Sequence, residues 1–292
     1  MKMNPVFKRE SMVTARSFRL ALTLLVFNGA LALVALLNMY STLAQVRLTA
    51  EIQYDSFMDL YLFVAVLEFV MLIFIMPAIS AGSISGERER QTLDLMLTTQ
   101  MTPADIVWGK MMASLSTMFL LIVSSFPIIA MVFVYGGVTM MDLLLLMLCF
   151  MVAGLFVGSL GLCCSALFKK STLSTVVTYA VMGVVVFGTF GINWFMQYVS
   201  GTGIRRYETV SGLTSSMMMS GGSLQYLMLL NPAGTFFASI TELTNHSQMA
   251  AKTAAELNAI QQNWVIVSIG VQLVLAAGMI WLAIRAIEIR KR

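Results

Sequence analysis

Six long stretches of this chain contain almost no charged residues, and they limit the possible fold more than any other feature. They cover residues 19–40, 57–81, 110–136, 141–168, 171–199 and 264–285. Each is long enough to supply the roughly 20 apolar residues that an α-helix needs to cross the hydrocarbon core of a bilayer. Membrane-spanning β-strands would alternate in polarity, whereas these stretches are continuously apolar. The pattern predicts an all-α polytopic membrane protein with six transmembrane helices.

The composition excludes an ordinary water-soluble domain. Hydrophobic residues make up 59% of the 292 residues and charged residues only 11%. Soluble domains are about 45–50% apolar and about 25% charged, so this chain has too few charges to cover a surface that faces water. We expect the lipid bilayer, and no nucleic acid, to be the surface that the chain contacts.

Lys and Arg gather on one side of the predicted membrane, and this sets the orientation. With the N-terminus inside, 14 of the 18 basic residues fall on the inner side, and the other four are Arg47, Arg205, Arg206 and Lys252. Cytoplasmic loops carry an excess of Lys and Arg. We therefore expect a multi-pass protein of the cell (plasma) membrane with both termini cytoplasmic.

Residues 224–240 (LQYLMLLNPAGTFFASI) could form a seventh span. Seven spans would reduce the charge bias to 11 against 7, and Asn231-Pro232 interrupts the stretch near its middle. Irregular backbone within a bilayer must be shielded by protein or line a cavity. We therefore predict six spans and an outer re-entrant hairpin at 224–240, inside an outer segment of residues 200–263.

The N-terminal residues 1–18 precede the first span and mix basic with apolar side chains. Asn4-Pro5 is typical of a helix start, with a capping residue followed by proline at the first helical position. We predict an amphipathic helix at the inner headgroups. A solvated basic tail is the alternative.

The loop at 82–109, between the second and third spans, is far longer than a simple connection requires. Ser85 is expected to cap a first helix with Glu87 and Glu89 in its first turns. Thr102 is expected to cap a second helix, with Pro103 at the first position and an acidic residue at the capping-box position. The pattern predicts two helices on the cytoplasmic face.

These loop residues resemble the permeases of the ABC-2 type. The stretch 87–97 (ERERQTLDLML), then Thr102-Pro103 and 106–110 (IVWGK), is similar to the family pattern E-R-E-x-G-T-L-E-L-L-L, a threonine-proline turn and I-x-x-G-K. The chain departs from the pattern at Gln91, where the family usually has glycine. The turn Leu230-Asn231-Pro232 also resembles the family's outer re-entrant hairpin.

The resemblance implies one ABC-2 transmembrane domain over residues 1–292, acting as a half-transporter. Such a permease pairs with a second permease half, identical or paralogous, and binds two ABC ATPase subunits. The 82–109 loop would hold the coupling helix, and the residues that would contact the ATPase are Glu87, Glu89, Thr92, Leu93 and Leu97. A solvated hairpin tip is the alternative for these charges.

The chain lacks several features that enzymes or metal proteins use. No G-x-x-x-x-G-K-[ST] phosphate loop occurs, so we expect ATP and Mg²⁺ on a partner ATPase and no cofactor on this chain. The only histidine, His246, lies far from the three cysteines, so we expect no metal site. We expect a transport subunit and no enzyme.

One acidic residue, Glu68, lies deep in the second span. A charge at this depth costs roughly 2.5 kcal/mol or more, so we expect a neutral Glu68, one facing a water-filled cavity, or one bonded to neutral groups. Ser124 and Ser125 of the antiparallel third span fall at a similar depth. We hypothesise a hydrogen bond from protonated Glu68 to one of them, with or without a role in transport.

Small residues in the fourth span predict close helix packing. Gly154 and Gly158 form a G-x-x-x-G pattern, and Gly161 follows with Ser165 four positions later. The neighbouring helix could belong to this chain or to the other permease half.

The leading hypothesis is the permease subunit of an ATP-driven ABC-2 exporter. An ion-coupled secondary transporter that uses Glu68 is the main alternative, and a non-transporting membrane scaffold is a third.

Overall fold

The computed structural model describes residues 5–49, 55–98, 101–134, 140–199, 222–245 and 263–291. These residues are almost wholly helical and include no β-strand. Within them, six segments are long and apolar enough to cross a membrane: Phe18–Ser41, Tyr61–Glu89, Pro103–Ile129, Met140–Leu167, Ser171–Met196 and Trp264–Ile289. The prediction of an all-α protein with six transmembrane helices is confirmed.

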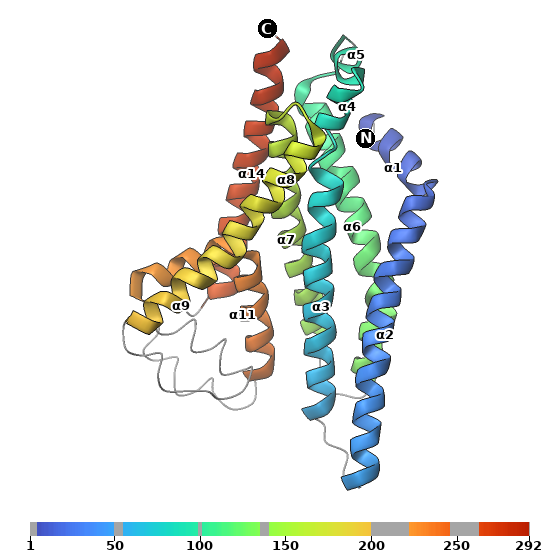
Figure 1. The fold of residues 1–292 in the computed structure, drawn as a ribbon, viewed down its shortest axis with the longest axis vertical. Helices are drawn as coiled ribbons and strands as arrows, with labels where there is room; N and C mark the ends of the chain where they lie inside the picture. Colours follow the sequence, from blue (N-terminus) through green and yellow to red (C-terminus); the bar gives the residue numbers. More distant parts are fainter. Residues whose placement is uncertain are drawn as a thin grey trace.

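The described helices follow one another in a fixed order along the chain. They are α1 (Pro5–Ala15), α2 (Phe18–Thr49), α3 (Asp55–Ser80), α4 (Ser85–Glu89), α5 (Thr92–Thr98), α6 (Pro103–Val134), α7 (Met140–Leu167), α8 (Ser171–Gly183), η1 (Val184–Gly188), α9 (Thr189–Val199), η3 (Gly222–Leu230), α11 (Pro232–Asn245) and α14 (Trp264–Lys291). The two chain ends lie at the same end of the bundle as α4 and α5 (Figure 1). This arrangement requires an even number of crossings.

Helix α7 is the centre of the bundle. It packs against α3, α6, α8, α11 and α14. Of the residues in its 18-residue apolar stretch, 61% are buried. Its glycines allow this close packing. A Cβ atom would meet the side chain of Met118 of α6 at Gly154, Met76 of α3 at Gly158 and Ser80 of α3 at Gly161. All three glycines therefore pack against helices of the same chain, which the sequence left open.

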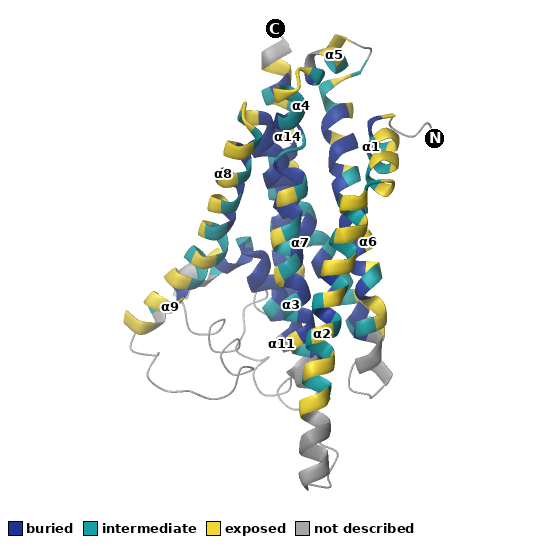
Figure 2. Cartoon of the chain, turned by 45° about the vertical axis from the view of Figure 1, so that its right-hand side comes forward, coloured by how far each residue is buried: buried dark blue, intermediate teal, exposed yellow. Residues whose placement is uncertain are grey.

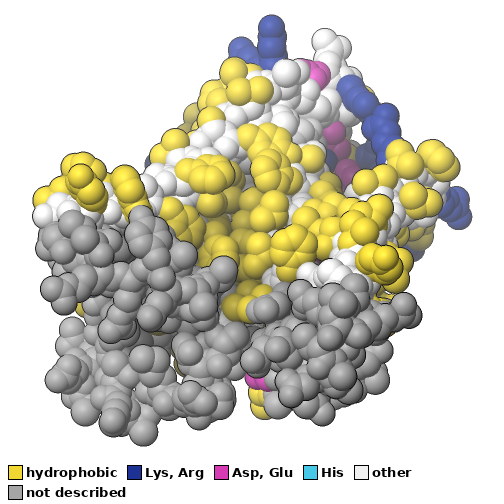
Figure 3. Space-filling view, turned by 60° about the horizontal axis from the view of Figure 1, so that its bottom comes forward, with side chains coloured by type: hydrophobic (Ala, Val, Ile, Leu, Met, Phe, Trp, Pro, Cys, Tyr) yellow, Lys and Arg dark blue, Asp and Glu magenta, His cyan; other side chains and the backbone are white. Residues whose placement is uncertain are grey.

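Helices α2 and α8–α9 lie at the periphery. Only 11% of the residues in the 18-residue apolar stretch of each of these two spans are buried. Exposed residues run along both spans (Figure 2). Many of the exposed side chains are large and apolar, and hydrophobic side chains cover much of the described surface seen in Figure 3. Apolar surface of this kind suits contact with lipid or with another membrane helix.

The α-helix of the fifth span passes through one turn of π-helix at η1. Asn231, between η3 and α11, lies against this turn. Its Nδ2 donates to the Val186 carbonyl at 3.2 Å and to Thr189 Oγ1 at 2.7 Å, while its Oδ1 accepts from the Ala233 amide at 2.9 Å. One side chain thus caps α11 and joins its start to the π-helical turn of the fifth span, which shields irregular backbone as a membrane requires.

The N-terminal helix α1 packs against the first turns of α6. The buried side chain of Val6 lies over Gly109, where a Cβ atom would be only 2.7 Å from Val6 Cβ. Met12 and Val13, on the remaining surface of α1, are 51% and 62% exposed. Residues 1–4 of the predicted N-terminal segment lie outside the described part of the chain.

Candidate functional site

The loop helices α4 and α5 lie on a second, smaller apolar cluster at one end of the bundle. Ile84 and Leu93 are buried there with residues of α6, α7 and α14: Val107, Met111, Leu162, Ala166, Ile280, Ala283 and Ile287. Leu97 is partly buried against the same cluster. Burial of a Leu or Ile side chain contributes roughly 1.5–3 kcal/mol, so the loop is held firmly to three spans.

The start of α4 is capped differently from the prediction. Ser85 was predicted as the N-cap, but Ile84 occupies that position and no side chain within the helix caps it. The cap comes from α7, where Ser165 Oγ accepts from the amides of Ile84 and Ser85, both at 2.9 Å. Ser85 is buried and its own hydroxyl donates back to the Ala81 carbonyl. The helix continues almost directly from α3, so its start depends on a contact that is distant in sequence.

The start of α6 is capped as predicted. The Thr102 amide donates to Asp105 Oδ2 at 3.1 Å, and the Asp105 amide donates to Thr102 Oγ1 at 3.2 Å. This reciprocal pair is a capping box. It marks the point where the loop ends and α6, the third span, begins.

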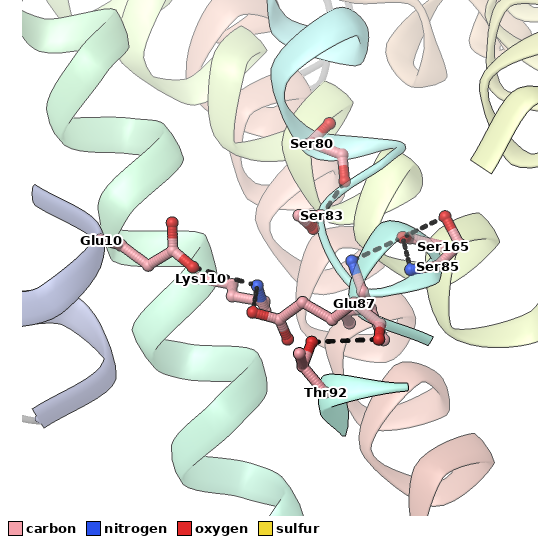
Figure 4. A network of polar contacts seen from close by, with 9 residues as sticks. Glu10, Ser80, Ser83, Ser85, Glu87, Thr92, Lys110 and Ser165 are labelled. Carbon is pink, nitrogen blue, oxygen red and sulfur yellow. Dashed lines mark hydrogen bonds and ion pairs between the residues drawn. The ribbon is translucent and has the colours of Figure 1, made fainter. Parts of the chain in front are cut away.

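A buried lysine joins three elements at this end of the protein. The Lys110 side chain on α6 is 3% exposed, and its Nζ pairs with Glu87 Oε1 of α4 at 2.9 Å and with Glu10 Oε1 of α1 at 3.2 Å. Figure 4 shows the ammonium group between the two carboxylates. Burial of a cation without partners is costly. The two carboxylates therefore offset the cost of burying the Lys110 ammonium group.

The next two charged side chains of α4 reach the turn between α7 and α8. Arg88 donates to the carbonyls of Phe168 at 2.9 Å and Ala166 at 3.1 Å. Glu89 accepts from the Ser171 amide at 2.9 Å and from its hydroxyl at 2.7 Å. A cation therefore lies at the C-terminus of α7 and an anion at the N-terminus of α8, as the helix dipoles favour.

The residues predicted to contact an ATPase are mostly turned inward. Glu87 pairs with Lys110, Thr92 Oγ1 donates to the Glu87 carbonyl at 3.1 Å, and Leu93 is 4% exposed. Leu95 was not among the predicted contact residues, and it is 67% exposed on α5. Its helical position opposite the buried Leu93 and the partly buried Leu97 was the available signal.

Gln91, where the chain departs from the family pattern, has a left-handed backbone. Its φ is 58°, the one positive value among non-glycine residues in the part of the chain that the structure describes. Glycine adopts this conformation without a steric penalty, which explains why glycine suits the position. The residue lies between α4 and α5 and turns the chain from one to the other.

A second polar group of residues lies within the bundle. Glu68 is fully buried, and Ser125 Oγ donates to its Oε1 at 2.5 Å. Asn28 of α2 donates to the neighbouring Ser124 Oγ at 2.9 Å. A hydrogen bond thus joins Glu68 to one of the two serines with the serine as donor, so a protonated Glu68 stays a prediction, and these residues connect α2, α3 and α6. The role of Glu68 in transport stays a prediction.

The fold and these contacts define a class: a polytopic helical membrane protein whose α4–α5 loop is bound to several of its spans. Comparison with known families identifies the particular one. The family described as ABC-2 family transporter protein matches residues 18–285, so the chain belongs to the ABC-2 transporter family and is a transmembrane permease of an ABC-type transporter. No curated protein matches the chain.

Proposed function

We propose that this chain is the permease subunit of an ATP-driven exporter, and that its α4–α5 loop couples the spans to a separate ATPase subunit. The observation that carries the proposal is the loop itself. It buries Ile84 and Leu93 in a cluster shared with α6, α7 and α14, while Leu95 on its outer side stays 67% exposed. One face is therefore fixed to the spans and the other is free for a partner.

The arrangement supports a simple mechanism. ATP and Mg²⁺ bound by the partner ATPases would drive a movement of those subunits against α5. The movement would pass through the packed loop into the spans and switch the transport path between inner and outer access. A packed interface transmits such a displacement because it does not deform continuously. This chain supplies the path and the coupling loop, and the partner supplies the hydrolysis.

Two further features belong to the proposal. Both termini and the loop are cytoplasmic, as the positive charges favour. The lightly buried helices α2 and α8–α9 leave apolar surface for lipid and for a second permease half, identical or paralogous. The two short helices η3 and α11, which meet at Asn231, form the re-entrant hairpin on the outer side.

The proposal is tested by purifying the full-length tagged chain from native membranes and identifying what accompanies it. An ABC ATPase subunit is expected in stoichiometric amount. Leu95→Gln is expected to weaken its retention about tenfold, because an interface that buries a leucine gains roughly 1.5 kcal/mol or more. The matched control is Ile289→Gln, which alters an apolar side chain that is 64% exposed on α14 and is expected to retain the ATPase.

The same experiment separates the alternatives. An ion-coupled transporter based on Glu68, or a membrane scaffold, has no need of an ATPase. If the chain purifies intact without one, the exporter proposal fails.

A further inference from the structure

Three consecutive charged side chains of α4 reach three different spans. Glu87 pairs with Lys110 of α6 at 2.9 Å. Arg88 donates to the last carbonyls of α7, and Glu89 accepts from the first residue of α8. Each of the three charges thus binds a group of this chain, and the Glu89 side chain does so while it is exposed to solvent.

The two contacts at the α7–α8 turn supply what those helix ends lack. The N-cap residue of α8, Lys170, makes no side-chain cap, so Glu89 provides the missing acceptor for the Ser171 amide. Arg88 binds two carbonyls at the end of α7 with separate nitrogens, and such paired contacts fix direction as well as distance. The α7–α8 turn is therefore held to α4 from both sides.

The Lys110 contact extends the same connection to the N-terminal helix. Lys110 is bound by carboxylates of two different elements, Glu87 of α4 and Glu10 of α1. Since Val6 of α1 also packs on Gly109 of α6, α1 cannot shift without disturbing the ion pairs. A displacement of α4 can therefore be transmitted to two neighbouring helices, α8 and α1.

We infer that Glu87, Arg88 and Glu89 are positioning residues that carry the displacement of the loop into the spans, with Arg88 and Glu89 serving α8, and Glu87 with Lys110 and Glu10 serving α1. Contact with the ATPase is left to α5. The inference rests on the proposed function and revises the roles that the sequence gave to Glu87 and Glu89.

The test measures the movement of α8 and that of α1 separately, in the full complex with its ATPase reconstituted in lipid nanodiscs. A cysteine introduced at Val176 of α8 or at Arg16 after α1 carries an environment-sensitive fluorophore. Val176 and Arg16 are exposed, whereas Cys149, Cys163 and Cys164 are buried, so the introduced thiol reacts selectively. The readout is the change in emission on adding ATP with orthovanadate, which traps the closed ATPase.

Each variant is expected to remove most of the emission change at one of the two probes. Arg88→Met and Glu89→Gln remove most of the change at position 176 and leave that at position 16. Glu87→Gln and Glu10→Gln do the reverse. Arg90→Met is the matched control for Arg88→Met, because Arg90 follows on the same loop but is exposed, and it leaves both probes unchanged. Glu89→Asp, which keeps the carboxylate, restores part of the α8 response.

Retention of the ATPase and a monodisperse elution profile distinguish this role from misfolding, and all four variants are expected to show both. The inference is overturned if the variants silence both probes alike, or neither, while the ATPase stays bound. It is also overturned if they release the ATPase, since their contact would then be with the partner. If the unmodified chain purifies without an ATPase, the proposed function itself is overturned.

Discussion

At the scale of single residues, Gln91 shows how one backbone angle constrains the loop. Its φ of 58° lies in the left-handed region, which costs an L-amino acid with a Cβ roughly 1–2 kcal/mol. The family pattern places glycine here, so the chain retains a strained turn between α4 and α5. The strain is offset by the burial of Ile84 before the turn and of Leu93 after it.

We predict that Gln91→Gly stabilises the protein. Relief of the left-handed strain is expected to exceed the greater entropy of glycine in the unfolded chain, with a net gain of up to about 1 kcal/mol. The midpoint of thermal denaturation in detergent measures the effect. Gln91→Val is the opposite control, because a β-branched side chain is least tolerant of positive φ, and its midpoint should fall. Equal midpoints for the two variants would contradict the strain.

At the scale of elements, the apolar stretches were enough to predict the spans, because membrane length and hydropathy act locally in sequence. The capping box at Thr102 was predicted for the same reason, since both partners lie within one turn. The capping of α4 was predicted wrongly because its acceptor, Ser165, belongs to another helix. The pairing of Lys110 with Glu10 was also beyond reach, as charge pattern alone does not say which helices touch.

The packing of α7 gives a prediction at the same scale. A Cβ at Gly161 would lie 2.1 Å from Ser80 Oγ, 3.0 Å from Ser80 Cβ and 3.2 Å from the Ala81 amide nitrogen, so backbone as well as side chain must move. At Gly154 the obstacle is the flexible end of Met118. Gly161→Ala is therefore expected to cost roughly 1–3 kcal/mol, and Gly154→Ala less.

The order of thermal denaturation midpoints tests this prediction. The control is Gly270→Ala on α14, where a Cβ meets nothing within 4 Å, and it should leave the midpoint unchanged or raise it slightly. A midpoint for Gly161→Ala at or above that of Gly154→Ala would show that α3 and α7 can separate at low cost.

At the scale of the whole molecule, the chain ends and the α4–α5 loop share one end of the bundle (Figure 1), and six described segments can cross a membrane. These two facts agree only if η3 and α11 together make no net crossing. The break at Asn231, and the hydrogen bonds of that residue to the fifth span, suit the proposed hairpin, in which a short pair of helices would enter the membrane and return. The segment between the fifth and sixth spans then begins and ends on the same side.

This topology makes a last prediction about the two ends of that segment. Cysteines introduced at Ser215 and Ala250, on either side of η3 and α11, should both react with a membrane-impermeant thiol reagent applied to intact cells, because both would be outside. Lys169→Cys, in the exposed turn between α7 and α8, should react only after the membrane is opened. The native cysteines are buried and give no background. Labelling at position 215 alone would mean that 224–240 crosses the membrane, which would place the C-terminal basic residues outside and reduce the bias of Lys and Arg to 11 against 7.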